Sequence, residues 1–143
     1  MSILETLNWR YATKRMTGAK VPQAKVDTIL EAARLSPSAF GMQPYKVIVI
    51  ENEELRKKLQ PVAYKQAQIA ECSHLLVFAA FENITEQHIL NHFNLLATTT
   101  GAPIEKFNDY IGMVKGSLLG LTEEVQFNWN ARQTYIALGT ALV

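Results

Sequence analysis

The chain has 143 residues, of which 48% are hydrophobic, and this is enough for one domain with a substantial core. Its 14 basic and 13 acidic side chains nearly cancel, so the composition gives no sign of a nucleic-acid-binding surface. The single cysteine, Cys72, excludes an intrachain disulfide and favours a reducing compartment. We expect a cytoplasmic protein, because no signal-peptide pattern is evident and the longest apolar run, 75–81, is far too short to cross a membrane.

Two helices are predicted before the first proline-rich segment. Ser2 and Glu5 have the spacing of a capping box, so a short helix should follow as far as about Trp9. Residues 26–33 place apolar side chains at the i, i+3, i+4 and i+7 positions of one buried helix face. This second helix should end just before Pro37, because proline pushes the preceding residue out of the helical region.

Two strands are predicted in the middle of the chain. Residues 47–50 are β-branched throughout, which predicts a buried strand. Residues 74–81 are apolar on both faces, as in a strand that helices cover on both sides. Between them, Asn52 can cap a helix that turns Leu55 and Leu59 inward.

The remainder of the chain predicts helices. Apolar stripes run through 89–96 and 104–118, and a last pattern passes through Val125, Trp129 and Ile136. Glycines at every fourth position of 112–120 indicate either close packing against another helix or a flexible segment. Because two strands make a poor sheet, further strands are expected from a partner chain or from sequence beyond residue 143.

Two short segments carry residue types that bind ligands. Segment 10–15 (RYATKR) places three cations directly after a helix, and such cations suit a phosphate group. The plainer alternative is a solvated basic loop. Segment 36–44 (SPSAFGMQP) combines two hydroxyls and two prolines with Gly41, which permits close approach of the backbone to a ligand. Its alternative is a rigid connector whose hydroxyls cap its own backbone, and the residues alone leave both questions open.

The order of these segments resembles the nitroreductase family, whose members are FMN-dependent flavoproteins that use NAD(P)H. The basic segment is followed by ILEAARLSPSAFGMQPY at 29–45 and AYKQAQIAECSHLLVFAA at 63–80, and the resemblance returns at 132–143. It implies an α+β fold with a mixed sheet surrounded by helices, assembled as an intertwined homodimer. It also implies a single domain over residues 1–143, with the family's C-terminal third lying beyond Val143.

The resemblance assigns cofactor-binding residues position by position. In the family, the residue matching Arg10 pairs with the FMN phosphate, and the residue matching Lys14 lies near N1 and O2 of the flavin. Ala12 stands where a serine commonly adds a bond to the phosphate, and Gly41 replaces the usual asparagine of a loop that reaches the flavin from the other subunit. The implied cofactor-binding residues are Arg10, Tyr11, Ala12, Lys14, Pro37, Ser38, Ala39, Gly41, Gln43, Lys65 and Gln68.

The activity implied by the resemblance is transfer of electrons from NAD(P)H to a nitroaromatic or quinone-type acceptor by a ping-pong mechanism. The chemistry is centred on the flavin, so no catalytic side chain is expected. Two alternatives are a flavin-binding or flavin-sequestering protein with little turnover, and a specialised flavoenzyme of the same family. No nucleic-acid, membrane or metal partner is expected, because His88 and His92 have the spacing of metal ligands but no third ligand nearby. Cys72 is expected to be an inert core thiol.

Overall fold

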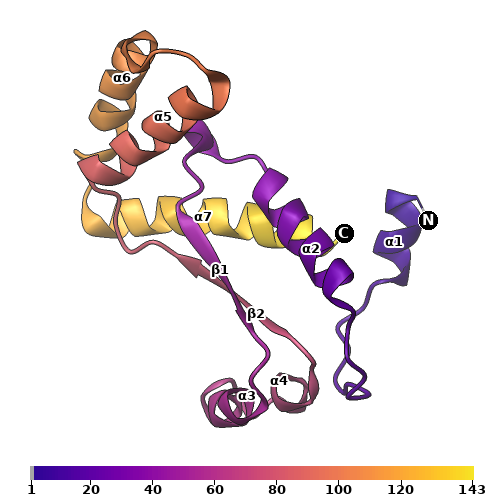
Figure 1. Ribbon diagram of the computed structural model, residues 1–143. Helices are drawn as coiled ribbons and strands as arrows, with labels where there is room; N and C mark the ends of the chain where they lie inside the picture. The colour runs from indigo at the N-terminus through magenta and orange to yellow at the C-terminus, as the bar shows by residue number, and fades with distance from the viewer. Residues whose placement is uncertain (1) are drawn as a thin grey trace. The chain divides into compact units, whose positions relative to one another are not determined.

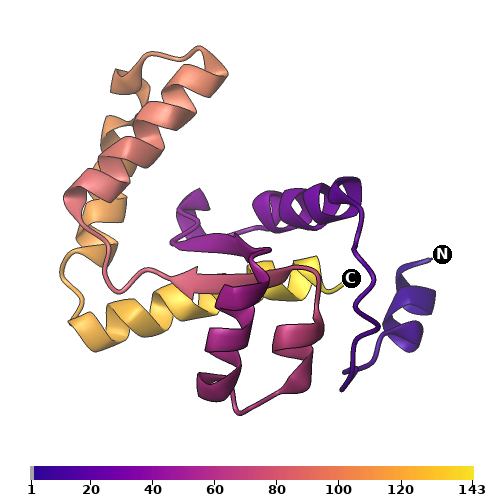
Figure 2. The same ribbon diagram turned by 60° about the horizontal axis from the view of Figure 1, so that its bottom comes forward.

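The computed structural model describes residues 2–143, and Figures 1 and 2 show it from two sides. Over this range the structure has seven α-helices, three short 3₁₀ helices and two strands. In chain order they are α1 (Ile3–Trp9), α2 (Gln23–Leu35), η1 (Ala39–Gly41), β1 (Tyr45–Ile50), α3 (Glu53–Leu59), η2 (Gln60–Val62), α4 (Ala67–Glu71), β2 (Leu75–Ala80), α5 (Glu86–Thr100), η3 (Ile104–Phe107), α6 (Asn108–Leu118) and α7 (Glu123–Ala141).

The chain divides into two compact units, and each is described by itself. Unit 1 takes in the chain up to Ser36, together with Lys46–Ala79 and Ala137–Val143. Unit 2 consists of Pro37–Tyr45 and Ala80–Ile136.

Both helices predicted at the start of unit 1 are confirmed. The Glu5 backbone N–H donates to Ser2 Oγ at 3.3 Å, and the Ser2 backbone N–H donates to Glu5 Oε2 at 2.6 Å, which completes the capping box. Helix α2 ends at Leu35, where the restriction imposed by Pro37 ends it. Val26 and Ala33 form its buried face.

The two predicted strands form, and they pair side by side as a two-stranded antiparallel sheet (Figure 1). Their predicted burial is wrong, however. The side chains of β1 alternate between exposed and half-buried, and Val77 in β2 is also exposed. Two strands with the helices of this chain leave part of each sheet face uncovered, so apolar composition alone did not bring full burial.

In helix α3 one predicted side-chain orientation is wrong. Its cap is confirmed, since Asn52 Oδ1 accepts the Leu55 N–H at 2.8 Å. Leu55 nevertheless points to solvent, whereas Arg56 is only 6% exposed. The Arg56 guanidinium donates to the carbonyl oxygens of Glu51 and Ser73, and these bonds compensate the cost of burying it.

The core of unit 2 lies between α5 and α6, which run side by side in both views (Figures 1 and 2). The apolar stripes predicted for these helices are confirmed. Phe93 is fully buried at the centre, with its ring edge-on to Tyr110 at a centroid distance of 5.3 Å. The buried cluster consists of Met42, Ile84, Ile89, Phe93, Ile111, Val114 and Leu118.

The glycines of α6 are not used for close helix packing. A Cβ atom placed on Gly112 or Gly116 would meet nothing within 4 Å, and the same holds for Gly120. Residues 108–118 nevertheless form a regular helix. No close helix packing at these glycines is therefore found among residues 2–143.

Helix α7 buries polar side chains where apolar ones were predicted. Val125 and Ile136 are exposed, whereas Gln126, Asn130 and Gln133 are buried. We call these three residues the polar stripe of α7. Their amide groups bond to backbone atoms of other segments, which is the condition for burying them. Within residues 2–143, no helix combines the length and apolar character that crossing a bilayer requires.

Candidate functional site

The segment Pro37–Pro44, which we call the proline loop, has an unusual backbone. Phe40, Gly41 and Gln43 have φ angles of 57°, 70° and 43°, all in the left-handed region. A left-handed conformation costs a residue other than glycine about 1–2 kcal/mol, so Phe40 and Gln43 adopt it only because their surroundings hold them there. Gly41 carries no such cost, which gives a physical reason for glycine at this position.

Hydrogen bonds from two sides hold this loop. The Gln43 N–H donates to Ser38 Oγ at 3.0 Å, which closes the loop on itself. The Ala39 N–H donates to Gln133 Oε1 at 2.8 Å, which ties the loop to α7. The loop is therefore part of the folded framework of unit 2 rather than a free connector.

Aromatic rings pack against the proline loop. The Phe40 ring stacks on Trp129 and meets Tyr110 edge-on, each at a centroid distance of 6.3 Å. The His92 ring fills the space beside Gly41, where a Cβ atom would come within 3.4 Å of it. Burial lowers the pKa of His92, against a smaller opposing effect of its hydrogen bond to the Phe40 backbone, so the neutral imidazole is favoured there.

In the basic segment of unit 1, residues 10–15, one cation forms an ion pair with another described residue and two do not. Arg15 Nε donates to Glu71 Oε1 at 2.8 Å, and the Met16 N–H donates to Glu71 Oε2 at 2.9 Å. The Arg15 bond, with help from the Met16 N–H, holds the pKa of Glu71 below its ordinary value. Arg10 and Lys14, in contrast, form no ion pair with any residue between 2 and 143.

Gln68 and Lys65 belong to the same unit as the basic segment. Gln68 Nε2 donates to the Thr13 carbonyl oxygen at 3.3 Å, so α4 lies against this segment. Tyr64 and Lys65 have φ angles of 53° and 55°, a second pair of left-handed residues. The structure thus brings Gln68 to the segment that carries Arg10, Tyr11, Ala12 and Lys14, whereas Pro37, Ser38, Ala39, Gly41 and Gln43 lie together in unit 2.

At residues other than glycine, left-handed backbone is confined to these two places in the described part of the chain. Among the described residues, the only non-glycine residues with positive φ are Phe40, Gln43, Tyr64 and Lys65. The first two are in the proline loop, and the last two are in the connection between α3 and α4. Strained backbone of this kind tends to occur at ligand-binding sites, where the surrounding structure maintains it.

A cavity of about 310 Å³ lies beside the proline loop within unit 2. It is lined on one side by Gly41–Pro44 and on the other by His88 and His92 of α5. The His88 Nδ1 accepts the Thr85 N–H at 3.1 Å, which leaves the proton of the neutral ring on Nε2. Between residues 2 and 143, no three His, Cys, Asp or Glu side chains lie close enough to hold a metal ion.

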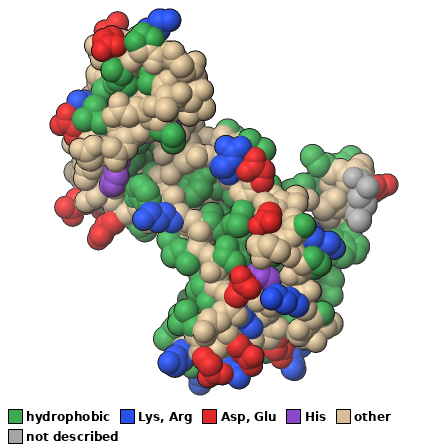
Figure 3. Space-filling model, viewed as in Figure 1, with side chains coloured by type: hydrophobic (Ala, Val, Ile, Leu, Met, Phe, Trp, Pro, Cys, Tyr) green, Lys and Arg blue, Asp and Glu red, His purple; other side chains and the backbone are tan. Residues whose placement is uncertain are grey.

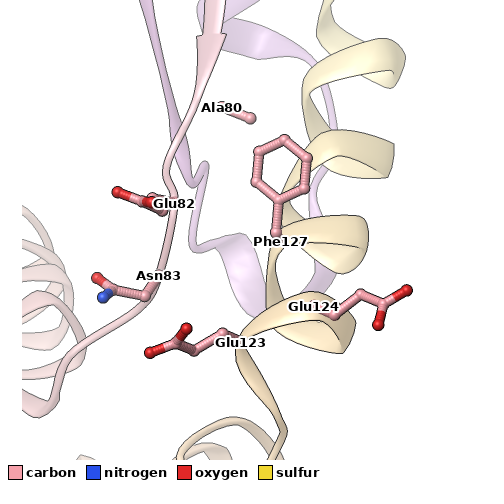
Figure 4. Close-up of a pocket in the computed structure, with 6 residues that line it drawn as sticks. All are labelled: Ala80, Glu82, Asn83, Glu123, Glu124 and Phe127. Carbon is pink, nitrogen blue, oxygen red and sulfur yellow. The ribbon is translucent and has the colours of Figure 1, made fainter.

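A larger cavity of about 680 Å³ in unit 2 was not predicted (Figure 4). In Figure 4 the Phe127 ring points from α7 toward Ala80, Glu123 lies beside Asn83, and Glu124 points away from both. With Glu82, three carboxylate residues and one aromatic residue line this cavity.

Gln133, Trp129 and His92 support the proline loop, yet sequence reasoning did not select them for that role. The sequence pattern predicts Trp129 in an apolar stripe, and it gives His92 only a metal-ligand spacing with His88 that lacks a third ligand. A usable signal for Gln133 was present: Gln126, Asn130 and Gln133 recur at i, i+4 and i+7, the spacing of one helix face.

Comparison with known proteins gives a consistent result. A sequence model of the nitroreductase family matches residues 7–143. A provisionally named NAD(P)H nitroreductase of Staphylococcus saprophyticus is 32% identical over 99% of this chain. This chain spans 67% of that protein's length.

Solved structures share the fold. The provisionally named nitroreductase YdfN of Bacillus subtilis superposes with a TM-score of 0.84 at 15% identity, over 96% of this chain and 67% of that one. A provisionally named nitroreductase of Exiguobacterium sibiricum, solved in complex with FMN, superposes with a TM-score of 0.79 at 20% identity. That match covers 99% of this chain and 68% of the other. These likenesses confirm the predicted fold class.

Proposed function

This chain belongs to the nitroreductase family of oxidoreductases, and from that premise we propose that it binds FMN and passes electrons from NAD(P)H to a nitroaromatic or quinone-type acceptor by a ping-pong mechanism. The observation that carries the proposal is the confinement of left-handed, non-glycine backbone to two segments. Both segments hold residues that the family resemblance assigns to the flavin. A connector without a ligand gives no reason to maintain such strain.

The donors of unit 1 fit an anionic cofactor. Arg10 and Lys14 are exposed cations without ion-pair partners among residues 2–143. Arg10 would hold the phosphate through its planar guanidinium, and Ala12 offers no hydroxyl to share that role. Lys14 would place positive charge near N1 and O2 of the flavin, where reduction increases negative charge. FMN supplies the redox chemistry when bound, and the protein supplies binding, orientation and electrostatics.

The proline loop would contribute a shaped, uncharged surface. Gly41 permits close approach of backbone to a planar ring, and Pro37 and Pro44 restrict the loop at both ends. Ser38 Oγ is already engaged by the Gln43 N–H, so the hydroxyl shapes the loop in addition to any contact it makes with a ligand. Lys65 and Gln68 are proposed to face the pyrimidine edge of the flavin.

A homodimer is part of the proposal. Helix α1 buries no residue of its own, and Ile3, Leu4 and Leu7, which share one face, are 67%, 70% and 46% exposed. Figure 3 shows hydrophobic side chains at the surface of this segment. An exposed apolar helix face of this kind is typical of a protein–protein interface, and a second copy of the chain is the occupant we propose.

The test is reconstitution with FMN followed by anaerobic reduction. The purified protein should take up added FMN, bleach with NAD(P)H and regain colour with a quinone. Uptake of FMN without bleaching would indicate a flavin-sequestering protein, and no uptake would refute the proposal.

Arg10→Ala tests the phosphate assignment. We expect FMN affinity to fall by about tenfold to a hundredfold, as for loss of a charge-assisted, bidentate contact. Lys58→Ala is the control, since it removes another exposed cation, from α3, at a position with no assigned role in binding. An unchanged affinity in Arg10→Ala would remove Arg10 from the site.

A further inference from the structure

The three residues of the polar stripe all bond to backbone groups of unit 2. Gln126 Oε1 accepts the Ile84 N–H at 2.7 Å, and its Nε2 donates to the Leu118 carbonyl oxygen at 2.9 Å. Asn130 Nδ2 donates to the Phe81 carbonyl oxygen at 2.9 Å. Gln133 Oε1 accepts the Ala39 N–H at 2.8 Å. One helix face therefore fixes both segments of chain from which unit 2 is built.

The bond to Ala39 stands out because the turn it supports has no cap of its own. Ala39 is the first residue of η1, and no side chain of the neighbouring residues caps that short helix. The Ser38 hydroxyl, which would be the local candidate, accepts the Gln43 N–H instead. Gln133, 94 residues further along the chain, takes the place of the missing cap.

The position of this bond connects it to the strained backbone. The Ala39 N–H belongs to the peptide that joins Ser38 to Ala39, and the next residue, Phe40, is left-handed. Gln133 is only 7% exposed, so its amide is held by packing and its removal would leave the Ala39 N–H without its bond. The Gln133 side chain is therefore placed to stabilise the turn at Ala39–Gly41.

We propose that Gln133 is the positioning residue of the proline loop: by accepting the Ala39 N–H it holds the Ser38–Ala39 peptide in the orientation that FMN binding uses. The inference rests on the proposed function for its consequence, flavin affinity. Its structural content, the conformation of the loop, does not depend on a bound cofactor. The two can therefore be tested separately.

The experiment compares Gln133→Met with Gln126→Met. Both variants replace a buried amide of α7 by an apolar side chain of similar length, but only Gln133 touches the proline loop. Hydrogen exchange of the Ala39 amide is measured by NMR on the whole chain without cofactor, the FMN dissociation constant by fluorescence titration, and the melting temperature by circular dichroism.

We expect Gln133→Met to speed exchange of the Ala39 amide and to weaken FMN binding, each by about fivefold, the effect of one lost hydrogen bond. Gln126→Met should lower the melting temperature at least as much, since Gln126 makes two bonds, yet leave both other quantities near the wild-type values.

Unchanged exchange at Ala39 in Gln133→Met would overturn the positioning role. An equal loss of FMN affinity in both variants would also overturn it, because the effect would then follow from stability alone. Failure of the wild-type protein to bind FMN would refute the proposed function, while the exchange measurement would still decide the role of Gln133. If Gln133→Met does not fold, Gln133→Glu retains the acceptor oxygen and should keep the Ala39 amide protected; rapid exchange there would overturn the role.

Discussion

Tyr64→Gly should stabilise this protein, although glycine substitutions usually destabilise. Tyr64 is left-handed, with φ of 53°, and 94% exposed, so its side chain contributes almost nothing through burial. Glycine removes a left-handed cost of about 1–2 kcal/mol from the folded state. Against this, the greater conformational entropy of glycine in the unfolded chain lowers stability by about 0.5–1 kcal/mol. The expected net gain in the free energy of unfolding is about 0.5–1 kcal/mol.

Val62→Gly is the matched control. Val62 is also highly exposed, at 80%, and lies two residues away, but it belongs to η2 and has no positive φ. It should lose about 0.5–1 kcal/mol, since glycine relieves no strain there. The two variants should therefore differ by about 1.5 kcal/mol in urea-induced unfolding at 25 °C.

The result bears on the site as well as on stability. If both glycine variants lower the free energy of unfolding equally, the connection between α3 and α4 stores no strain, and its left-handed backbone gives no support to a ligand-binding role. If Tyr64→Gly stabilises as expected, it should also loosen the segment that presents Lys65. A weaker affinity for FMN would then accompany the gain in stability.

Three further predictions concern the core, a histidine and the cysteine. Phe93→Ala should lower the free energy of unfolding by about 3–5 kcal/mol in urea, because the ring is fully buried. Leu95 is 66% exposed on the same helix, so Leu95→Ala should change it by no more than about 0.5 kcal/mol. Similar losses in both variants would contradict the assigned core. In the folded protein the pKa of His92 is lowered from its ordinary 6.5. As pH falls, the unfolded chain therefore binds a proton at His92 before the folded chain does. The contribution of neutral His92 to stability should be complete above about pH 7 and decline as pH falls toward the folded pKa. Measured between pH 7.5 and 5, the free energy of unfolding should change less steeply with pH in His92→Asn than in the wild-type protein. An identical pH dependence would show that His92 does not contribute. Burial raises the pKa of Cys72, so its thiol should react with a disulfide reagent at pH 7.5 more slowly than the urea-unfolded chain does; equal rates would contradict the assignment of an inert thiol.

Local structure followed from local sequence. The capping box of Ser2 and Glu5, the Asn52 cap and the end of α2 before Pro37 depend on residues within a few positions of one another, and all three were predicted correctly. The apolar stripes of α5 and α6 were predicted for the same reason, since helical spacing alone defines which side chains share a face.

Burial decided by distant segments was not predictable in the same way. Arg56 was not expected inside because its carbonyl partners, at Glu51 and Ser73, are brought to it by folding. On α7 the polar stripe replaced the expected apolar face because Ile84, Phe81 and Ala39 present backbone groups that need partners. An isolated helix pattern carries no record of such groups.

The candidate site divides along the same line. By itself, the sequence determined which segments carry ligand-binding residue types and the family they resemble, because residue chemistry and spacing are written in the chain. Only the tertiary structure decided that Arg15 is bound by Glu71 while Arg10 is not, and that Gln133 holds the proline loop. The physical reason is that a hydrogen bond or an ion pair depends on a distance in space, which the order of residues does not contain.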